Sequence, residues 1–168
     1  MAVSRGIEHA VKVDVAQMRV GQAPMRIMTL ALGSCLGIVL HDPEARIGAL
    51  AHAMHPRRER VKNKMNRAKF VDSVIPLLLE RMIQWGARRE KIVAKVFGGA
   101  RMFDGFEGCR GILQIGDENI VAAREVLKEL GIPLVAECVG GRTGRTIVLD
   151  VSDGSVLVRH VNDTEEIY

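Results

Sequence analysis

The chain has 168 residues, a formal net charge of +4 at pH 7, and a composition that is 48% hydrophobic, 26% charged and only 4% aromatic. These values are typical of one globular domain, residues 1–168, with a mostly aliphatic core. No apolar run approaches the roughly 18 residues that span a bilayer, and the N-terminus lacks a signal-peptide pattern, so we expect a cytoplasmic protein without membrane insertion.

The first half of the chain is predicted to be mostly strands. Apolar and polar residues alternate over 11–20, which predicts one half-buried strand, and a loop follows at 21–24. Further strands are predicted at 26–30, 36–41 and 46–54. Residues 42–45 read Asp-Pro-Glu-Ala, a type I turn pattern that joins the last two strands into a hairpin.

The next segment, residues 57–69, is strongly basic. It contains seven basic residues: Arg57, Arg58, Arg60, Lys62, Lys64, Arg67 and Lys69. A solvated loop and a docking patch for an acidic surface both fit this pattern. Nucleic acid fits less well because the segment has no aromatic side chains for base stacking.

The second half alternates helices and strands. Helical spacing of apolar residues predicts helices at 68–85, with Pro76 as a kink or the effective start, and at 117–130. Strands are predicted at 91–97, 133–139, 145–151 and 156–160. The glycine-rich loop 140–145 is interpreted as a tight turn, with contact between Arg142 or Arg145 and an acidic substrate surface as the alternative.

Together these elements predict an α/β fold. The strands around Cys35 are apolar on both faces, so we expect a sheet that is covered on both sides. The expected architecture is a layered α/β sandwich with mixed, largely antiparallel pairing and two main helices.

Cys35 is the candidate nucleophile because it follows Gly33 and Ser34 between two apolar runs. If the turn closes symmetrically, paired residues in the hairpin have numbers that sum to 87, and Cys35 faces His52. A bulge or an asymmetric loop would change this register. Directly opposed Cβ atoms lie about 4.5 to 5.5 Å apart, which suits a thiol and an imidazole.

Thr29 is the candidate third member of this site. It lies six residues before Cys35, and its hydroxyl could orient the imidazole if the turn at Gly33 and Ser34 brings the strand back. Considered alone, Cys35 is more often a small core residue, and His52 is more often a core histidine with satisfied hydrogen bonds. His41 and His55 are expected to lie away from Cys35, at the turn end of its strand and on the opposite face of the next one.

The remaining cysteines, Cys109 and Cys138, are interpreted as structural. An odd number of cysteines without a Cys-x-x-Cys pair favours reduced thiols over a disulfide framework. A zinc site that includes Cys35 and His52 is conceivable, but no local pair of ligands has the usual spacing, so we expect no metal or other cofactor.

Several separate motifs resemble the CheD family, the chemoreceptor glutamine deamidases of chemotaxis. They are residues 29–37, His52 seventeen positions after Cys35, residues 94–100, Ile115-Gly116 with Asn119, and residues 139–145. The resemblance covers about 26–160. It implies a cysteine hydrolase on an α/β sandwich, with Cys35 as nucleophile, His52 as base and Thr29 as the third member.

The resemblance also implies substrates and partners. Receptor glutamines would be converted to glutamates, a CheC-type phosphatase would act as regulator, and a methylesterase activity toward receptor methyl esters is allowed. The residues fit this chemistry, because backbone N–H groups around Gly33 and Ser34 are natural donors to an oxyanion. The alternative is a non-catalytic binding module for an acidic partner, with Cys35 merely buried.

Overall fold

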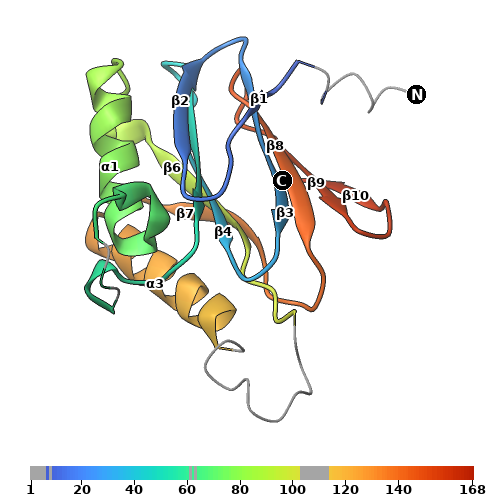
Figure 1. Ribbon diagram of the computed structural model, residues 1–168. Coiled ribbons are helices and arrows are strands. Elements are labelled where there is room, and N and C mark those ends of the chain that lie inside the picture. The colour runs from blue at the N-terminus through green and yellow to red at the C-terminus, as the bar shows by residue number, and fades with distance from the viewer. Residues whose placement is uncertain (1–6, 8, 61, 63, 103–113) are drawn as a thin grey trace.

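The computed structural model describes residues 7, 9–60, 62, 64–102 and 114–168. In these residues the chain forms two five-stranded sheets and two α-helices (Figure 1). The first sheet has the order β1 (Val11–Lys12), β3 (Arg26–Leu32), β8 (Arg145–Asp150), β9 (Val156–His160), β10 (Glu165–Ile167). The second has the order β2 (Met18–Gln22), β5 (Ile47–Ala53), β4 (Leu36–Asp42), β6 (Val93–Gly98), β7 (Leu134–Val139).

The helices α1 (Val71–Gln84) and α3 (Ile115–Glu129) cover one face of the second sheet, and the first sheet covers the other (Figure 1). Short 3₁₀ turns occur at Arg58–Arg60, Arg67–Lys69 and Arg89–Lys91. Among the named strands of the described residues, only the pairs β1–β3 and β6–β7 are parallel. The predicted α/β sandwich with two helices and largely antiparallel pairing is therefore confirmed.

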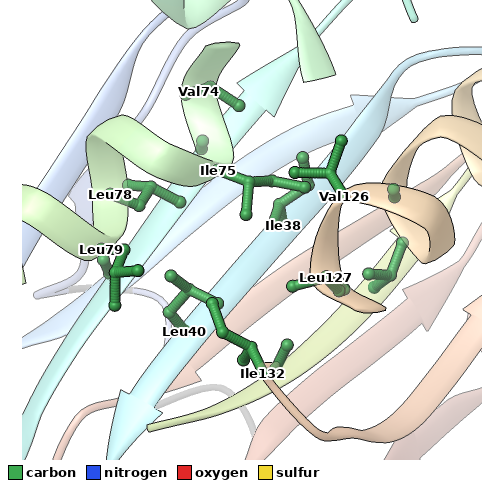
Figure 2. Close-up of a cluster of buried hydrophobic side chains, with 14 of the residues drawn as sticks. Ile38, Leu40, Val74, Ile75, Leu78, Leu79, Val126, Leu127 and Ile132 are labelled. Atoms are coloured by element: carbon green, nitrogen blue, oxygen red, sulfur yellow. The ribbon is translucent and has the colours of Figure 1, made fainter. Parts of the chain in front are cut away.

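The central hairpin β4–β5 is buried along its whole length. Leu36, Ile38 and Leu40 pack against the helices in one apolar cluster, part of which appears in Figure 2. Val39 and Leu50 point the other way, into a second cluster between the two sheets. Alternation of side chains along a strand produces this division, and because both faces of β4 are covered, most of its residues are apolar.

Neither helix in the described part of the chain is long and apolar enough to cross a membrane.

The prediction of one strand over 11–20 is wrong. The chain forms β1 in the first sheet and β2 in the second, with a turn between them in which Ala16 has a φ of 60°. The turn is closed by Gln17, whose side chain accepts from Asp14 N–H and whose N–H donates to the Asp14 carbonyl. Alternation alone does not reveal a change of sheet within the segment.

The predicted hairpin register is also wrong, by two residues. Leu36 pairs with Ala53 and Gly37 with His52, so pair numbers sum to 89. The reason is a four-residue loop. Asp42 accepts hydrogen bonds from the N–H groups of Glu44 and Ala45, and Arg46 takes a left-handed φ of 54°. A shift of two residues preserves the face of each side chain, so Cys35 and His52 stay on the same side.

Two further differences concern elements. The strand β10 was not predicted, although it pairs with β9 and completes the first sheet. Helix α1 begins at Val71, so Pro76 lies inside the helix and does not mark its start.

Candidate active site

Thr29 and His52 meet between the two sheets. Thr29 is in β3 of the first sheet, His52 is in β5 of the second, and the Thr29 Oγ1 lies 2.7 Å from the His52 Nδ1. Both side chains are buried, with 0% and 2% exposure. The contact arises from the packing of the sheets rather than from a turn that returns the strand.

The hydrogen bonds of Thr29 determine which imidazole nitrogen carries the proton. The Thr29 hydroxyl donates to the Val13 carbonyl at 2.7 Å, and a hydroxyl has only one proton to donate. Its contact with Nδ1 must therefore be an N–H donated by His52. In the neutral ring Nε2 then has a free lone pair. Among the described residues this buried Nε2 has no hydrogen-bond partner.

A bulge in β3 directs the chain from Thr29 to Cys35. Thr29 pairs with Ile147 and Leu32 with Arg145, so β3 holds one extra residue, and Ala31 has a φ of 54°. Bulges of this kind bend a strand and redirect its side chains. The chain then turns through Gly33 and Ser34 to Cys35, which directly precedes β4.

Cys35 is half-buried and packs against the apolar cluster between the sheets. Since Gly37 is opposite His52, Cys35 is displaced by two positions along the same face. Burial raises the pKa of the Cys35 thiol, and its own backbone N–H acts in the opposite direction. Burial lowers the pKa of His52, opposed by the charge of Asp14. Both shifts favour a neutral thiol and a neutral imidazole at neutral pH.

Three hydrogen bonds hold the carbonyl groups of the loop Gly33–Cys35. Ala100 N–H donates to the Gly33 carbonyl at 2.7 Å, and Gly99 N–H donates to the Cys35 carbonyl at 2.9 Å. The Asn119 Nδ2 donates to the Ser34 carbonyl at 2.9 Å. The backbone of the loop is therefore held by the β6 end and by α3.

Gly98 allows this close approach of backbone to backbone. It has a φ of 101°, and a Cβ at this position would lie 2.3 Å from the Cys35 carbonyl oxygen. An alanine would add a steric clash to an unfavourable backbone conformation.

We expect Gly98→Ala to lower the free energy of unfolding by about 2 to 4 kcal/mol, measured by chemical denaturation. Gly86→Ala is the matched control, because Gly86 has a φ of 105° and a Cβ placed on it would meet nothing within 4 Å. Its loss should be only about 1 kcal/mol. Equal losses in the two variants would show that the contact with Cys35 has no energetic weight.

Comparison with known proteins places this chain in a family. Residues 54–160 match the model of CheD, described as CheD chemotactic sensory transduction. A protein of Moorella thermoacetica named "Probable chemoreceptor glutamine deamidase CheD" is 46% identical over 151 residues, 90% of each chain. The chain belongs to the CheD family. A Clostridium botulinum (strain Hall) CheD of the same name is 44% identical over 158 residues, 94% of this chain and 97% of its own.

The match to the CheD relatives includes the candidate site. A continuous match of 151 residues in a chain of 168 must include residues 18–151. Thr29, Cys35 and His52 all lie within that segment, although the family model itself matches only from residue 54.

The other two histidines of this part of the CheD fold have different surroundings. His41 is buried at the far end of β4, and its Nε2 lies 3.0 Å from the Val151 carbonyl. His55 follows β5 and stacks near Phe70, with ring centroids 6.1 Å apart. Cys109 lies outside the described residues.

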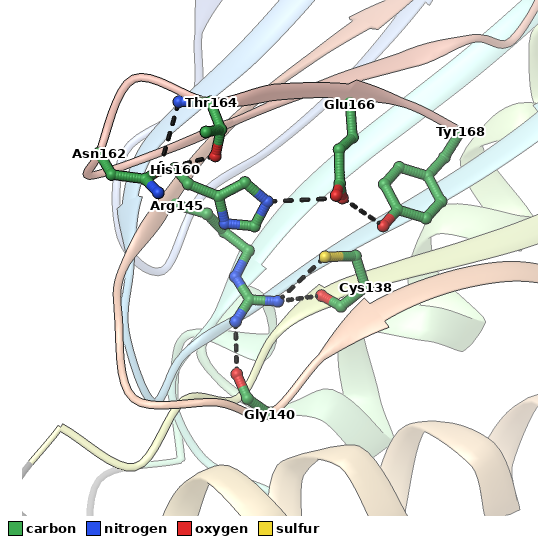
Figure 3. Close-up of polar contacts among 8 residues, drawn as sticks. All are labelled: Cys138, Gly140, Arg145, His160, Asn162, Thr164, Glu166 and Tyr168. Carbon is green, nitrogen blue, oxygen red and sulfur yellow. Dashed lines mark hydrogen bonds and ion pairs between the residues drawn. The ribbon is translucent and has the colours of Figure 1, made fainter.

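Cys138 belongs to a separate polar cluster at the end of β7 (Figure 3). The Arg145 guanidinium, which is 5% exposed, donates to the carbonyls of Cys138 and Gly140 and lies 3.3 Å from the Cys138 sulfur. Arg145 therefore holds the glycine loop as a tight turn, in line with the first of the two interpretations. A role of Arg145 in contacting a substrate surface is wrong, whereas Arg142 is exposed.

The same cluster contains metal-ligating side chains. Ligand atoms of Cys138, His160 and Glu166 lie within 4.8 Å of one another. In their present arrangement His160 Nε2 is 3.5 Å from Glu166, and the Tyr168 hydroxyl donates to Glu166 at 2.6 Å. The adjacent Arg145 guanidinium would repel a metal cation. These side chains already contact one another in a polar network, and this network attaches the C-terminal strand β10.

Sequence reasoning missed two groups that contact the site. The Val13 carbonyl fixes the tautomer of His52 through Thr29, and no sequence pattern points to a backbone carbonyl. Asn119 stands out in the sequence only as part of a CheD motif. The sequence signal for Asn119 is its position inside a helix with apolar neighbours. Its side-chain amide is buried there and needs hydrogen-bond partners.

Proposed function

We propose that the protein is a protein-glutamine deamidase that converts glutamine side chains of chemoreceptors to glutamates, with Cys35 as nucleophile and His52 as base. The observation that carries the proposal is the orientation of His52. Its Nδ1 is held by Thr29, and its Nε2 is buried without a described partner on the face that Cys35 shares. The names of the CheD relatives supply the substrate.

The reaction begins with the neutral pair. His52 Nε2 takes the proton of the Cys35 thiol as the sulfur attacks the carbonyl carbon of the glutamine carboxamide. A tetrahedral intermediate forms, with a negative charge on the former carbonyl oxygen. The backbone N–H groups of Ser34 and Cys35 are the proposed donors to this oxygen, and Gly33 lets the substrate approach the backbone closely.

The intermediate then collapses. The protonated His52 gives its proton to the leaving nitrogen, ammonia departs, and a thioester joins Cys35 to the substrate. A water molecule attacks the thioester while His52 accepts its proton. The C–S bond breaks, the thiol regains its proton from His52, and a glutamate remains. This sequence of steps needs no cofactor.

The pH dependence of kcat/KM should be broad. Protonation of His52 removes the base, so activity falls at low pH, and the lowered pKa of His52 moves that fall below the ordinary histidine value. Loss of the Cys35 proton leaves none for ammonia, so activity falls at high pH, and the raised pKa moves that fall above the ordinary thiol value. Two measurements check these limits: the pH profile of kcat/KM, and the difference in thiolate absorbance between the parent and Cys35→Ala. A Cys35 thiolate signal at neutral pH would contradict the neutral pair.

Thr29 variants test the orientation of His52. We expect Thr29→Val, which keeps the shape but loses the hydroxyl, to lower kcat about 10- to 100-fold, because the imidazole loses its fixed tautomer. Thr29→Ser keeps a hydroxyl and should retain most activity. The two turnover rates on one receptor substrate decide the point. Parental activity in Thr29→Val would make Thr29 a packing residue only.

The function itself is tested with receptors from the same source. Cytoplasmic receptor fragments are incubated with the protein, and released ammonia and the mass change from amide to carboxylate are followed in peptides. Cys138→Ser is the matched control for a thiol outside the site, and it should behave as the parent does. If the parent converts no glutamine, the deamidase proposal fails and a non-catalytic binding module becomes the better description.

Family membership supports proposals about finer features of the function. We propose that a CheC-type phosphatase regulates the enzyme and that receptor methyl esters are a second substrate, because methanol leaves a tetrahedral intermediate more easily than ammonia does. A thiol nucleophile works only while it is reduced, so we also propose a cytoplasmic location. Cys35 and Cys138 are both free thiols.

A further inference from the structure

The peptide groups on either side of Ser34 are fixed by their carbonyls. In a trans peptide the C=O and the N–H point in opposite directions. The bond from Ala100 to the Gly33 carbonyl therefore sets the direction of the Ser34 N–H, and the bond from Asn119 to the Ser34 carbonyl sets that of the Cys35 N–H. Among the described residues neither N–H group donates to a backbone carbonyl, and the Cys35 N–H faces its own sulfur.

We propose that Asn119 is a positioning residue for the deamidation step, because its side-chain amide holds the Ser34–Cys35 peptide so that the Cys35 N–H donates to the oxyanion of the tetrahedral intermediate. The inference rests on the proposed function and adds a residue from α3 to it. Asn119 itself does not touch the substrate. It acts through the peptide group that carries the donor.

The location of the Cys35 N–H supports this role. This N–H is close enough to its own sulfur to oppose the effect of burial on the thiol pKa. A carbonyl carbon under attack by the sulfur is therefore next to the same N–H group. A donor in this place stabilises charge that develops only in the transition state.

Asn119 also reaches the strand that carries His52. The same Nδ2 donates to the Met54 carbonyl at 3.0 Å, and Met54 lies two residues after His52. One fully buried amide nitrogen thus connects the chain around the nucleophile to the chain around the base. Only a group with two donors on one atom can make both bonds, which excludes aspartate and leucine as equivalents.

The side-chain oxygen of Asn119 argues against a purely structural role for this residue. The Asn119 Oδ1 is buried and has no hydrogen-bond partner among the described residues. An unsatisfied buried acceptor destabilises a fold. The side chain is therefore placed for its donor nitrogen.

Helix α3 is seated closely enough to keep Asn119 in place. A Cβ on Gly116 would lie 2.7 Å from the Gly99 carbonyl oxygen, and a Cβ on Gly99 would lie 2.6 Å from the Ile120 side chain. The start of α3 and the turn after β6 are thus in direct contact. The two donors Gly99 N–H and Asn119 Nδ2 therefore belong to segments that pack directly against each other.

Asn119→Ala and Asn119→Ser test the proposal. Turnover is compared with the alkylation of Cys35 by iodoacetamide across pH, because displacement at a saturated carbon forms no oxyanion. We expect kcat for receptor deamidation to fall about 10- to 100-fold in Asn119→Ala with little change in KM, while the alkylation profile keeps its pH midpoint. Asn119→Ser, which retains one donor, should fall less and serves as the test variant if Asn119→Ala does not fold.

A receptor peptide whose target carboxamide is replaced by an aldehyde measures the tetrahedral adduct directly. Its affinity should fall by the same factor as kcat. Asn162→Ala is the matched control, since Asn162 is an exposed asparagine in the turn between β9 and β10 and should leave every measurement unchanged.

The possible failures are distinct. A parent protein that releases no ammonia rejects the proposed function and the oxyanion role with it. A parent that is active, with Asn119→Ala equally active, rejects the role of Asn119 alone. If the pH midpoint of alkylation shifts in Asn119→Ala while kcat falls, Asn119 acts on the thiol or on the fold. That result also overturns the proposal.

Discussion

Cys35→Ala is expected to lower receptor deamidation by on the order of 10⁴-fold or more while the fold remains intact. The loss is chemical, because Cys138, the other free thiol in the described part of the chain, lies in β7, three strands away from the β5 strand that carries His52. Cys35 is half-buried and lies just outside β4, so removing its sulfur should change the free energy of unfolding by less than about 1 kcal/mol. Ammonia release and chemical denaturation, measured on the same preparation, separate the two effects.

Cys138→Ala provides the comparison for this result. Cys138 is also a half-buried free thiol, but its neighbours are Arg145 and the glycine loop. It should keep parental turnover. Substantial turnover in Cys35→Ala, or an equal loss in both variants, would remove the basis for a cysteine mechanism.

His52→Gln is expected to lower kcat/KM by about 10²- to 10⁴-fold, the usual contribution of a general base. Glutamine has a similar length and polarity, but it cannot accept the thiol proton. The effect should be present across the whole pH range in which the parent is active. Cys35 should also lose reactivity toward iodoacetamide at neutral pH, because no base then assists the thiol.

His41→Gln is the matched control for His52→Gln. His41 is in the same hairpin, is 3% exposed, and makes one hydrogen bond to a backbone carbonyl, that of Val151. Both substitutions disturb a buried imidazole, so both should lower the free energy of unfolding. Only His52→Gln should lower turnover at a temperature where both proteins are folded. If the two variants lose activity equally, the base is not His52.

Much of the fold could be predicted because local patterns decide it. Helical periodicity located α1 and α3 to within a few residues, and β9 was predicted with its observed bounds. The apolar run of β4 correctly indicated a sheet covered on both faces. The division of 11–20 between two sheets depends on Ala16 in a left-handed conformation, and alanine gives no sequence signal for it.

The site could be predicted only in part, for a related reason. The hairpin register depended on Arg46, another non-glycine residue with positive φ, and was wrong by two. Because the error was an even number of residues, the predicted common face of Cys35 and His52 did not change. The proximity of Thr29 to His52 depends on the packing of two sheets, and that of Asn119 to Ser34 on a contact across 85 residues. Neither distance is encoded in local spacing.

That long-range contact has a consequence for synthesis of the protein. Thr29, Cys35 and His52 all leave the ribosome early, within the first third of the chain. Gly99 and Asn119, whose donors hold the loop around Cys35, emerge much later. A nascent or truncated chain therefore carries the reactive side chains without the backbone geometry that we propose they need. On this proposal the oxyanion donors are positioned only once α3 has been synthesised.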